Sequence, residues 1–300
     1  MRKFGIFALA ALLCCSLSGC MPFGGRVIRE AAKDAAEELE ESIMNYIDAN
    51  SYTAGNFTYA AADVRAVTVS WVGGSVTLAE GAGETLRAEE SGTLTAAQQM
   101  HWRVKDGVLE IMYCASGYLG IFPPNAKKLT LEVPAGADIT VDCVSASIDG
   151  SALHAGKLSL ATVSGAVTLA GAAAKEIKLH TTSGAVRLTG EITAEEATFE
   201  TVSGAVYVEG LHCTEADVSS VSGDVTLDLA ACGKADIATV SGNVKLTVPK
   251  ESGATFRYGT VSGKLRCEDY RVHGSENIIG DGACKVSVET VSGGLTVLGA

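Results

Sequence analysis

The chain has 300 residues, of which 47% are apolar and 6% aromatic, and its formal net charge is −12. Binding to nucleic acid requires clustered lysine and arginine, so an acidic chain without a basic patch is excluded from that class and no nucleic acid partner is expected. After residue 20, no stretch approaches the ~20 consecutive apolar residues of a membrane-spanning helix.

Residues 1–20 form a targeting segment in which Arg2 and Lys3 precede a short apolar run. Its end, Leu17-Ser18-Gly19-Cys20, resembles the lipobox of bacterial lipoproteins, with an ordinary secretory signal as the alternative. The resemblance implies that Cys20 is lipidated, with palmitate among the acyl chains, and becomes the new N-terminus. We therefore expect an extracytoplasmic protein of the cell envelope, anchored to membrane lipid without spanning the bilayer. Loss of Arg2 and Lys3 changes the formal charge from −12 to −14.

Residues 21–50 are expected to form a helical spacer or cap, because one narrow apolar stripe runs through them. The stripe comprises Ile28, Ala32, Ala35, Leu39, Ile43 and Tyr46. A coiled-coil seam is the alternative. The helix lacks a basic face, which argues against its lying on anionic lipid.

Residues 51–135 predict a first rung of a solenoid, interrupted by an excursion. Val67 to Leu78 alternates apolar and polar residues around Gly73-Gly74, Asp106-Gly107 predicts a hairpin, and Lys128 to Val133 predicts a return to strand. Between hairpin and return lies an apolar loop, which is either a partner surface or a cover over an open solenoid edge. Its candidate residues are Tyr118, Leu119, Ile121 and Phe122.

Residues 136–300 repeat the phrase Thr-Val-Ser-Gly followed by an apolar-x-apolar pair. Its serine recurs at steps of 19, 20, 19, 19, 21 and 30 residues, as Ser164, Ser183, Ser203, Ser222, Ser241, Ser262 and Ser292. A fixed period of this length predicts a solenoid in which each repeat stacks on its neighbour. Apolar residues six and four before the serine, and three and five after it, predict two half-buried strands per rung.

The predicted fold is therefore all-β: a right-handed parallel β-solenoid of about 19–20 residues per rung, preceded by a helix. We expect the Ser-Gly pair to lie where the chain turns a corner, with glycine supplying backbone angles that a side chain forbids. The stacked Thr and Ser residues are expected to be turn and ladder groups and not nucleophiles.

The longest step, between Ser262 and Ser292, contains an insertion that predicts a loop, and loops of repeat arrays often form binding faces. Its candidate site residues are Asp269, His273 and Glu276. Nothing holds these residues in metal-ligand spacing, so neither a metal nor a cofactor is expected.

Six cysteines follow Cys20, and Cys143, Cys213, Cys232 and Cys267 occupy columns that predict small buried residues. Buried thiols are one interpretation. The other is a Cys213–Cys232 disulfide, because adjacent rungs bring the α-carbons within bonding range. The pattern leaves the disulfide state of these cysteines open, and it does not assign Cys114 or Cys284.

Asp217 and Asp236 share one outward column on neighbouring rungs, near the ~5 Å carboxyl separation of a retaining glycosidase. No aromatic cleft accompanies them, and the phosphate-loop, calcium-nonapeptide and His-Glu-x-x-His motifs are absent. The sequence therefore predicts a protein that is not an enzyme, and a carbohydrate-active β-helix enzyme is the least favoured alternative.

The repeated phrase, Val133-Pro134-Ala135-Gly136 and the early Val72-Gly73-Gly74-Ser75-Val76 rung resemble the bacterial putative-adhesin family of envelope β-solenoids. The resemblance covers about residues 63–300. It implies a non-catalytic cell-surface lipoprotein that binds or scaffolds, with a glycan or an envelope protein as partner. The alternative is an envelope-stress or sensory accessory protein that docks onto a membrane partner.

Overall fold

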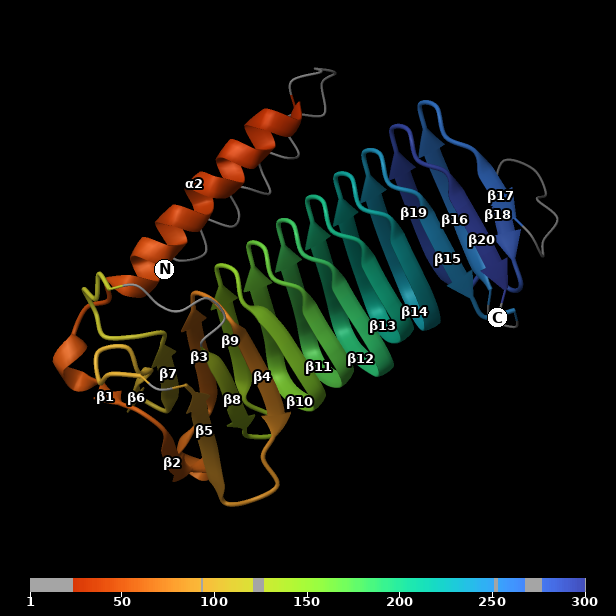
Figure 1. Ribbon diagram of the computed structural model, residues 1–300. Coiled ribbons are helices and arrows are strands. Elements are labelled where there is room, and N and C mark those ends of the chain that lie inside the picture. Colours follow the sequence, from red (N-terminus) through yellow and green to blue (C-terminus); the bar gives the residue numbers. More distant parts are fainter. Residues whose placement is uncertain (1–23, 93, 121–126, 251–252, 268–276, 300) are drawn as a thin grey trace.

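A computed structural model describes residues 24–92, 94–120, 127–250, 253–267 and 277–299. It is a long parallel solenoid with one α-helix, α2 (Gly24–Met44), so the predicted fold class is confirmed (Figure 1). No helix in these ranges has the length and apolarity needed to cross a membrane.

The strands are β1 (Thr53–Ala54), β2 (Phe57–Ala60), β3 (Ala66–Trp71), β4 (Ser75–Glu80), β5 (Thr85–Ser91), β6 (His101–Lys105), β7 (Val108–Met112), β8 (Lys128–Val133), β9 (Asp138–Cys143), β10 (Ser147–Thr162), β11 (Val167–Thr181), β12 (Val186–Thr201), β13 (Val206–Ser220), β14 (Val225–Thr239), β15 (Val244–Val248), β16 (Ala254–Thr260), β17 (Leu265–Cys267), β18 (Asn277–Ile279), β19 (Cys284–Thr290) and β20 (Leu295–Gly299). Short 3-10 turns, η1 (Ala49–Ser51) and η2 (Ala61–Asp63), precede the first rung.

The rungs stack in parallel with direct register, so each apolar column becomes a continuous ladder inside the solenoid. Val167 pairs with Val186, and Ile177 pairs with Ala197. These residues are at most 1% exposed. Strands β10 to β14 each span 15 or 16 residues, because each joins the second strand of one rung to the first strand of the next across a bend. The predicted columns therefore form the core.

The repeated phrase builds the corner through its threonine and its glycine. At Thr201 the side chain points inward, and the Gly204 N–H donates to its Oγ1 at 2.9 Å. The same bond recurs at the corners beginning at Thr162, Thr181, Ser220, Thr239, Thr260 and Thr290, at 2.7–3.1 Å. The buried hydroxyl thus satisfies a backbone donor that faces the core.

The corner serines connect one rung to the next. Ser183 Oγ–H donates to the carbonyl of Val163 at 3.2 Å, and the Ser222 hydroxyl repeats this toward Val202 at 3.3 Å. The prediction that the stacked Thr and Ser residues are turn and ladder groups is therefore confirmed for these corners.

The reason predicted for the corner glycine is wrong. None of the corner glycines in the phrase has a positive φ. A Cβ on Gly184 would instead lie 1.7 Å from the carbonyl oxygen of Gly165 in the rung before it. Close stacking of backbones, and not a left-handed conformation, therefore requires glycine at this position.

Left-handed backbone occurs at the other bend of the rung, which the sequence pattern did not indicate. Gly171, Gly190 and Gly210 have φ of 80°, 79° and 68°. In the preceding rung Ala152 occupies this place with φ of 48°. An L-residue in this region is strained by contact of its Cβ with the backbone.

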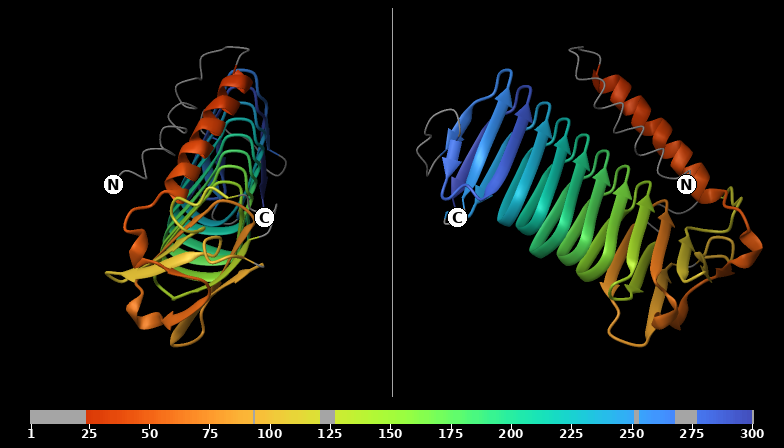
Figure 2. Two further views of the ribbon diagram at one scale, coloured as in Figure 1. Left: turned by 60° about the vertical axis from the view of Figure 1, so that its left-hand side comes forward. Right: turned by 180° about the vertical axis from the view of Figure 1, so that it is seen from behind.

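The excursion after the first rung closes the N-terminal end of the solenoid (Figures 1 and 2). Strands β6 and β7 form the predicted antiparallel hairpin around Asp106-Gly107. Helix α2 buries Leu39 and Ile43 at its C-terminal end, where Tyr46 OH donates to the Cys114 carbonyl. The rest of the helix runs on the side of the solenoid that carries the Ser-Gly corners.

The last two rungs stack out of chain order. Strand β19 lies between β14 and β16, and β20 lies between β15 and β17. The chain therefore forms the outermost rung first and then returns to fill the place beneath it. Because the strand β18 returns antiparallel along β16, the reversal is made at that end of the solenoid.

Candidate binding surface

A groove runs across the outer face of β12, β13, β14 and β19, beside the Ser-Gly corners. It consists of two adjoining hollows of about 640 and 370 Å³ that share Glu200, Ser219, Ala238 and Glu289. One side is a stripe of the valines that precede the corner serines: Val202, Val221, Val240, Val261 and Val291. The other side carries Thr198, Asp217, Asp236 and Ser287.

The groove is hollow because two small residues lie between two long ones. Glu200, Ser219, Ala238 and Glu289 are consecutive neighbours in one outward column. Ser219 and Ala238 form the floor, while the glutamates rise at its two ends. The order in which the rungs stack produces this arrangement. In the repeat pattern the next member of the column after Ala238 is Gly259, but in the folded chain the strand beside Ala238 carries Glu289. The signal available in the sequence was the run of small residues Ser219, Ala238 and Gly259, in a column whose other members are Ala161, His180, Glu200 and Glu289.

Opposite sides of the groove differ in chemistry. The valine stripe is apolar, and its exposure reaches 39% at Val291 and 82% at Val261 toward the outermost rung. The facing column is acidic. Beyond the Glu200 end, His180 Nδ1 lies 3.1 Å from Glu200 Oε2, and this hydrogen bond lowers the pKa of Glu200. The groove therefore offers apolar contact along one side and negative charge along the other.

The acidic column does not form a glycosidase pair. Carboxylate oxygens of Glu215, Asp217 and Asp236 lie within 4.8 Å of one another, while Lys234 Nζ lies 2.7 Å from both Glu215 and Asp236. Burial and the neighbouring carboxylates raise the pKa of Asp217. The lysine bridges two of the three acids, and none of the described residues that line the two hollows is aromatic. This arrangement is typical of a solvated ion-pair cluster, not of a general acid facing a nucleophile.

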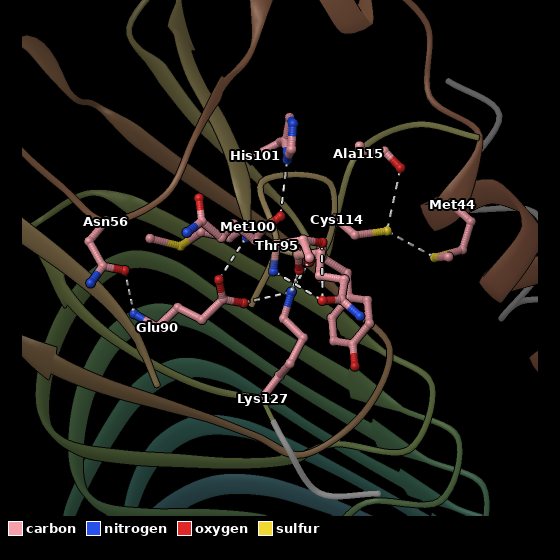
Figure 3. Close-up of polar contacts among 12 residues, drawn as sticks. Met44, Asn56, Glu90, Thr95, Met100, His101, Cys114, Ala115 and Lys127 are labelled. Carbon is pink, nitrogen blue, oxygen red and sulfur yellow. Dashed lines mark hydrogen bonds and ion pairs between the residues drawn. The ribbon is translucent and has the colours of Figure 1, made fainter. Parts of the chain in front are cut away.

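A second concentration of polar groups lies at the closed end of the solenoid, around Lys127 (Figure 3). The Lys127 side chain is fully buried, its Nζ lies 2.6 Å from Glu90 Oε1, and it donates to the carbonyls of Gln98 and Tyr113. The ring centroid of Trp71 lies 5.0 Å from the same nitrogen.

Desolvation lowers the pKa of Lys127, and the Glu90 carboxylate opposes that shift. Glu90 also accepts from the Met100 N–H at 2.8 Å. These contacts hold parts of the excursion against one another and against Trp71 of the first rung, so we assign this cluster to folding and not to ligand binding.

Of the predicted partner loop, the structure describes Tyr118 and Leu119. Leu119 is 95% exposed, while Tyr118 packs partly against the core. Ile121 and Phe122, the insertion residues Asp269, His273 and Glu276, and the lipidation residue Cys20 all lie outside the described residues. These residues stay predictions, while the described Tyr118 and Leu119 do not line the groove.

The cysteines differ in part from the prediction of small buried residues. Cys143 is buried, as expected, but Cys213, Cys232 and Cys267 are partly exposed. Cys114 and Cys284, which the sequence did not assign, are both buried.

Several crystal structures resemble the chain. One is a putative adhesin from Bacteroides fragilis, with 14% identity over 81% of this chain and 95% of that one and a TM-score of 0.48. Another is a putative adhesin from Parabacteroides distasonis, with 13% identity over 81% of this chain and 95% of that one and a TM-score of 0.44. No curated protein is significantly similar to the chain. The model of the Toastrack DUF4097 family matches residues 64–298, which include every rung described above. In agreement with the resemblance carried by its repeat phrase, the chain belongs to the Toastrack DUF4097 family.

Proposed function

We propose that the protein is a non-catalytic, adhesin-like surface protein, anchored through lipid on Cys20, whose groove binds an extended polypeptide segment of an envelope protein. The observation that supports this most directly is the floor made by Ser219 and Ala238 between Glu200 and Glu289. Ala161 and Gly259 are also small members of this column, but Ser219 and Ala238 are the pair of small residues that stack directly on one another.

The chemistry of the groove favours a ligand with both apolar and cationic groups. The valine stripe would bury apolar side chains, and Glu200, Asp217, Asp236 and Glu289 would attract lysine or arginine. Aromatic side chains supply large, rigid contact surfaces at binding sites. Their absence from the lining disfavours stacking of a sugar ring, so the glycan-binding adhesin is the second candidate.

The experiment compares capture by the full-length chain in detergent from solubilised envelope proteins and from a glycan array. Ala238→Tyr should fill the groove and reduce capture of the envelope protein at least tenfold. Thr226→Tyr is the matched control, because it adds a tyrosine outside the groove. Its direct neighbour on β13 is Tyr207, so this outward column already accommodates a tyrosine.

Charge is tested separately with Glu200→Gln and Glu289→Gln, each expected to weaken capture and its salt dependence. Glu191→Gln, at an exposed bend outside the groove, should change neither. Glycan capture that Ala238→Tyr abolishes would favour the second candidate. Capture that both tyrosine variants leave unchanged would contradict a role for the groove.

A further inference from the structure

Three cysteines from three adjacent strands line one cavity of about 390 Å³, away from the groove. Cys213 lies on β13, Cys232 on β14 and Cys284 at the start of β19. Cys213 and Cys232 are direct register partners, and their Sγ atoms are 3.3 Å apart. Both are partly exposed, while Cys284 is 5% exposed. A small molecule that enters this cavity can therefore reach two neighbouring thiols.

Strand spacing decides what these sulfurs can do together. Neighbouring strands lie about 4.8 Å apart, so Cys213 and Cys284, on either side of β14, are separated by two such steps. Two sulfur ligands of one zinc ion lie no more than about 4.6 Å apart, because each bond is about 2.3 Å long. In the described part of the chain, the only group of three or more His, Cys, Asp or Glu side chains close enough to share one metal ion is Glu215, Asp217 and Asp236. A three-sulfur metal site is thus disfavoured, whereas a bond between neighbouring cysteines fits the α-carbon range of disulfides.

We propose that Cys213 and Cys232 are a thiol–disulfide exchange site, which a small disulfide such as oxidised glutathione converts into a disulfide between adjacent rungs. In the first step Cys232 Sγ attacks one sulfur of the oxidant, forming a mixed disulfide and releasing one thiolate. In the second step Cys213 Sγ attacks Cys232 Sγ, the mixed disulfide breaks and the second thiolate leaves. The two protons lost by the cysteines end on the two released thiols, and the oxidant accepts two electrons.

Cys232 is the attacking sulfur because its strand, β14, lies between the strands of Cys213 and Cys284. Cys213 Sγ donates a hydrogen bond to it, and Cys284 lies on its other side. Hydrogen bonds from the two neighbours favour a thiolate and lower the pKa of Cys232, while hydrogen bonding to Cys232 and burial raise the pKa of Cys213 and Cys284.

Cys232 has two mutually exclusive partners, one on each neighbouring strand. With Cys213, the bond connects β13 and β14. With Cys284, it would connect β14 to the inserted strand β19. Direct register and partial exposure favour Cys213 in the native chain. When Cys213 is removed, we expect Cys284 to resolve the mixed disulfide in its place.

The test is peptide mapping of the full-length chain after treatment with oxidised glutathione, alkylation of free thiols in denaturant, so that the buried cysteines also react, and proteolysis without reductant. We expect a Cys213–Cys232 linked peptide, reversed by dithiothreitol, with Cys114, Cys143, Cys267 and Cys284 alkylated. Cys284→Ser and the matched control Cys143→Ser should retain the link. Cys213→Ser should form Cys232–Cys284, and Cys232→Ser should form no link between 213 and 284.

Two results would overturn the inference. The first is complete alkylation of both Cys213 and Cys232 after oxidation of the native chain. The second is a Cys213–Cys284 link in Cys232→Ser, because the strand spacing argued above forbids it. Neither result depends on ligand binding in the groove, so the test is independent of the proposed function.

Discussion

Gly204 stands directly against Gly184 in the stacked corners: a Cβ on Gly204 would lie 1.7 Å from the Gly184 carbonyl oxygen. Gly204→Ala must therefore displace backbone, and we expect it to destabilise the solenoid by more than about 3 kcal/mol. The measurement is the midpoint of thermal unfolding. Gly259→Ala is the control, since no atom lies within 4 Å of its added Cβ. Equal midpoints for the two variants would contradict the stacking argument.

The inward hydroxyl of Thr201 is expected to stabilise the corner through the Gly204 N–H. Thr201→Val keeps the shape of the side chain but leaves a buried donor unsatisfied, at a cost of about 1–3 kcal/mol. Thr201→Ser retains the acceptor, as Ser220 does in the next rung, and should cost less than the valine variant. Chemical denaturation of the native chain and of the two variants measures these differences in stability. A Thr201→Val variant as stable as the native chain would refute the role of the hydroxyl.

Ala152 is a position where stability can be gained. Its φ of 48° is strained for alanine, and the equivalent residue of the next rung is Gly171 with φ of 80°. Ala152→Gly removes about 1–2 kcal/mol of strain and adds chain entropy to the unfolded state, so we expect a net gain of about 0.5 kcal/mol. Gly171→Ala should have the opposite sign. A loss of stability in Ala152→Gly would show that the bend tolerates a side chain without strain.

Because Lys127 and Glu90 form a buried ion pair, we expect substitutions of the two residues to have non-additive effects on stability. Lys127→Met leaves the Glu90 carboxylate buried without its cation and should cost about 3–5 kcal/mol. Adding Glu90→Gln removes the stranded charge while retaining an oxygen for the Met100 N–H, and should recover part of the loss. Hydrogen exchange over residues 98–118 would locate the effect. A double variant less stable than Lys127→Met would contradict the charge argument.

Asp217 predicts a pH-dependent effect whose sign is opposite to that of a salt bridge. The pKa of Asp217 is higher in the folded protein than in the unfolded chain, so the folded state binds the proton more tightly. The protein therefore loses stability as the pH rises from the unfolded pKa through the folded pKa. Asp217→Asn should therefore stabilise the protein at pH 7 by only about 0.3 kcal/mol, because solvent screens this exposed group. The gain should vanish below about pH 3, where the carboxyl is protonated in both states. Urea titrations at the two pH values test this, and a gain that grows on acidification would oppose it.

Periodicity alone was sufficient to predict the solenoid, because the columns around each serine are contacts between residues a fixed number of positions apart. Stacking in register converts that period directly into buried ladders, as at Val167 and Val186. The hairpin at Asp106-Gly107 was equally accessible, since its turn is encoded by two adjacent residues. The reason why the corner requires glycine could not be predicted from the sequence, because the clash that excludes a side chain comes from another rung.

The groove and the cluster of Cys213, Cys232 and Cys284 depend on relationships that no period encodes. Glu289 closes the groove beside Ala238, and Cys284 lies beside Cys232, only because β19 inserts between β14 and β16. A repeat pattern identifies which residues are equivalent, but it does not state the order in which equivalent rungs stack. Strand β18 returns antiparallel along β16, and the order of the last rungs is set by these tertiary contacts.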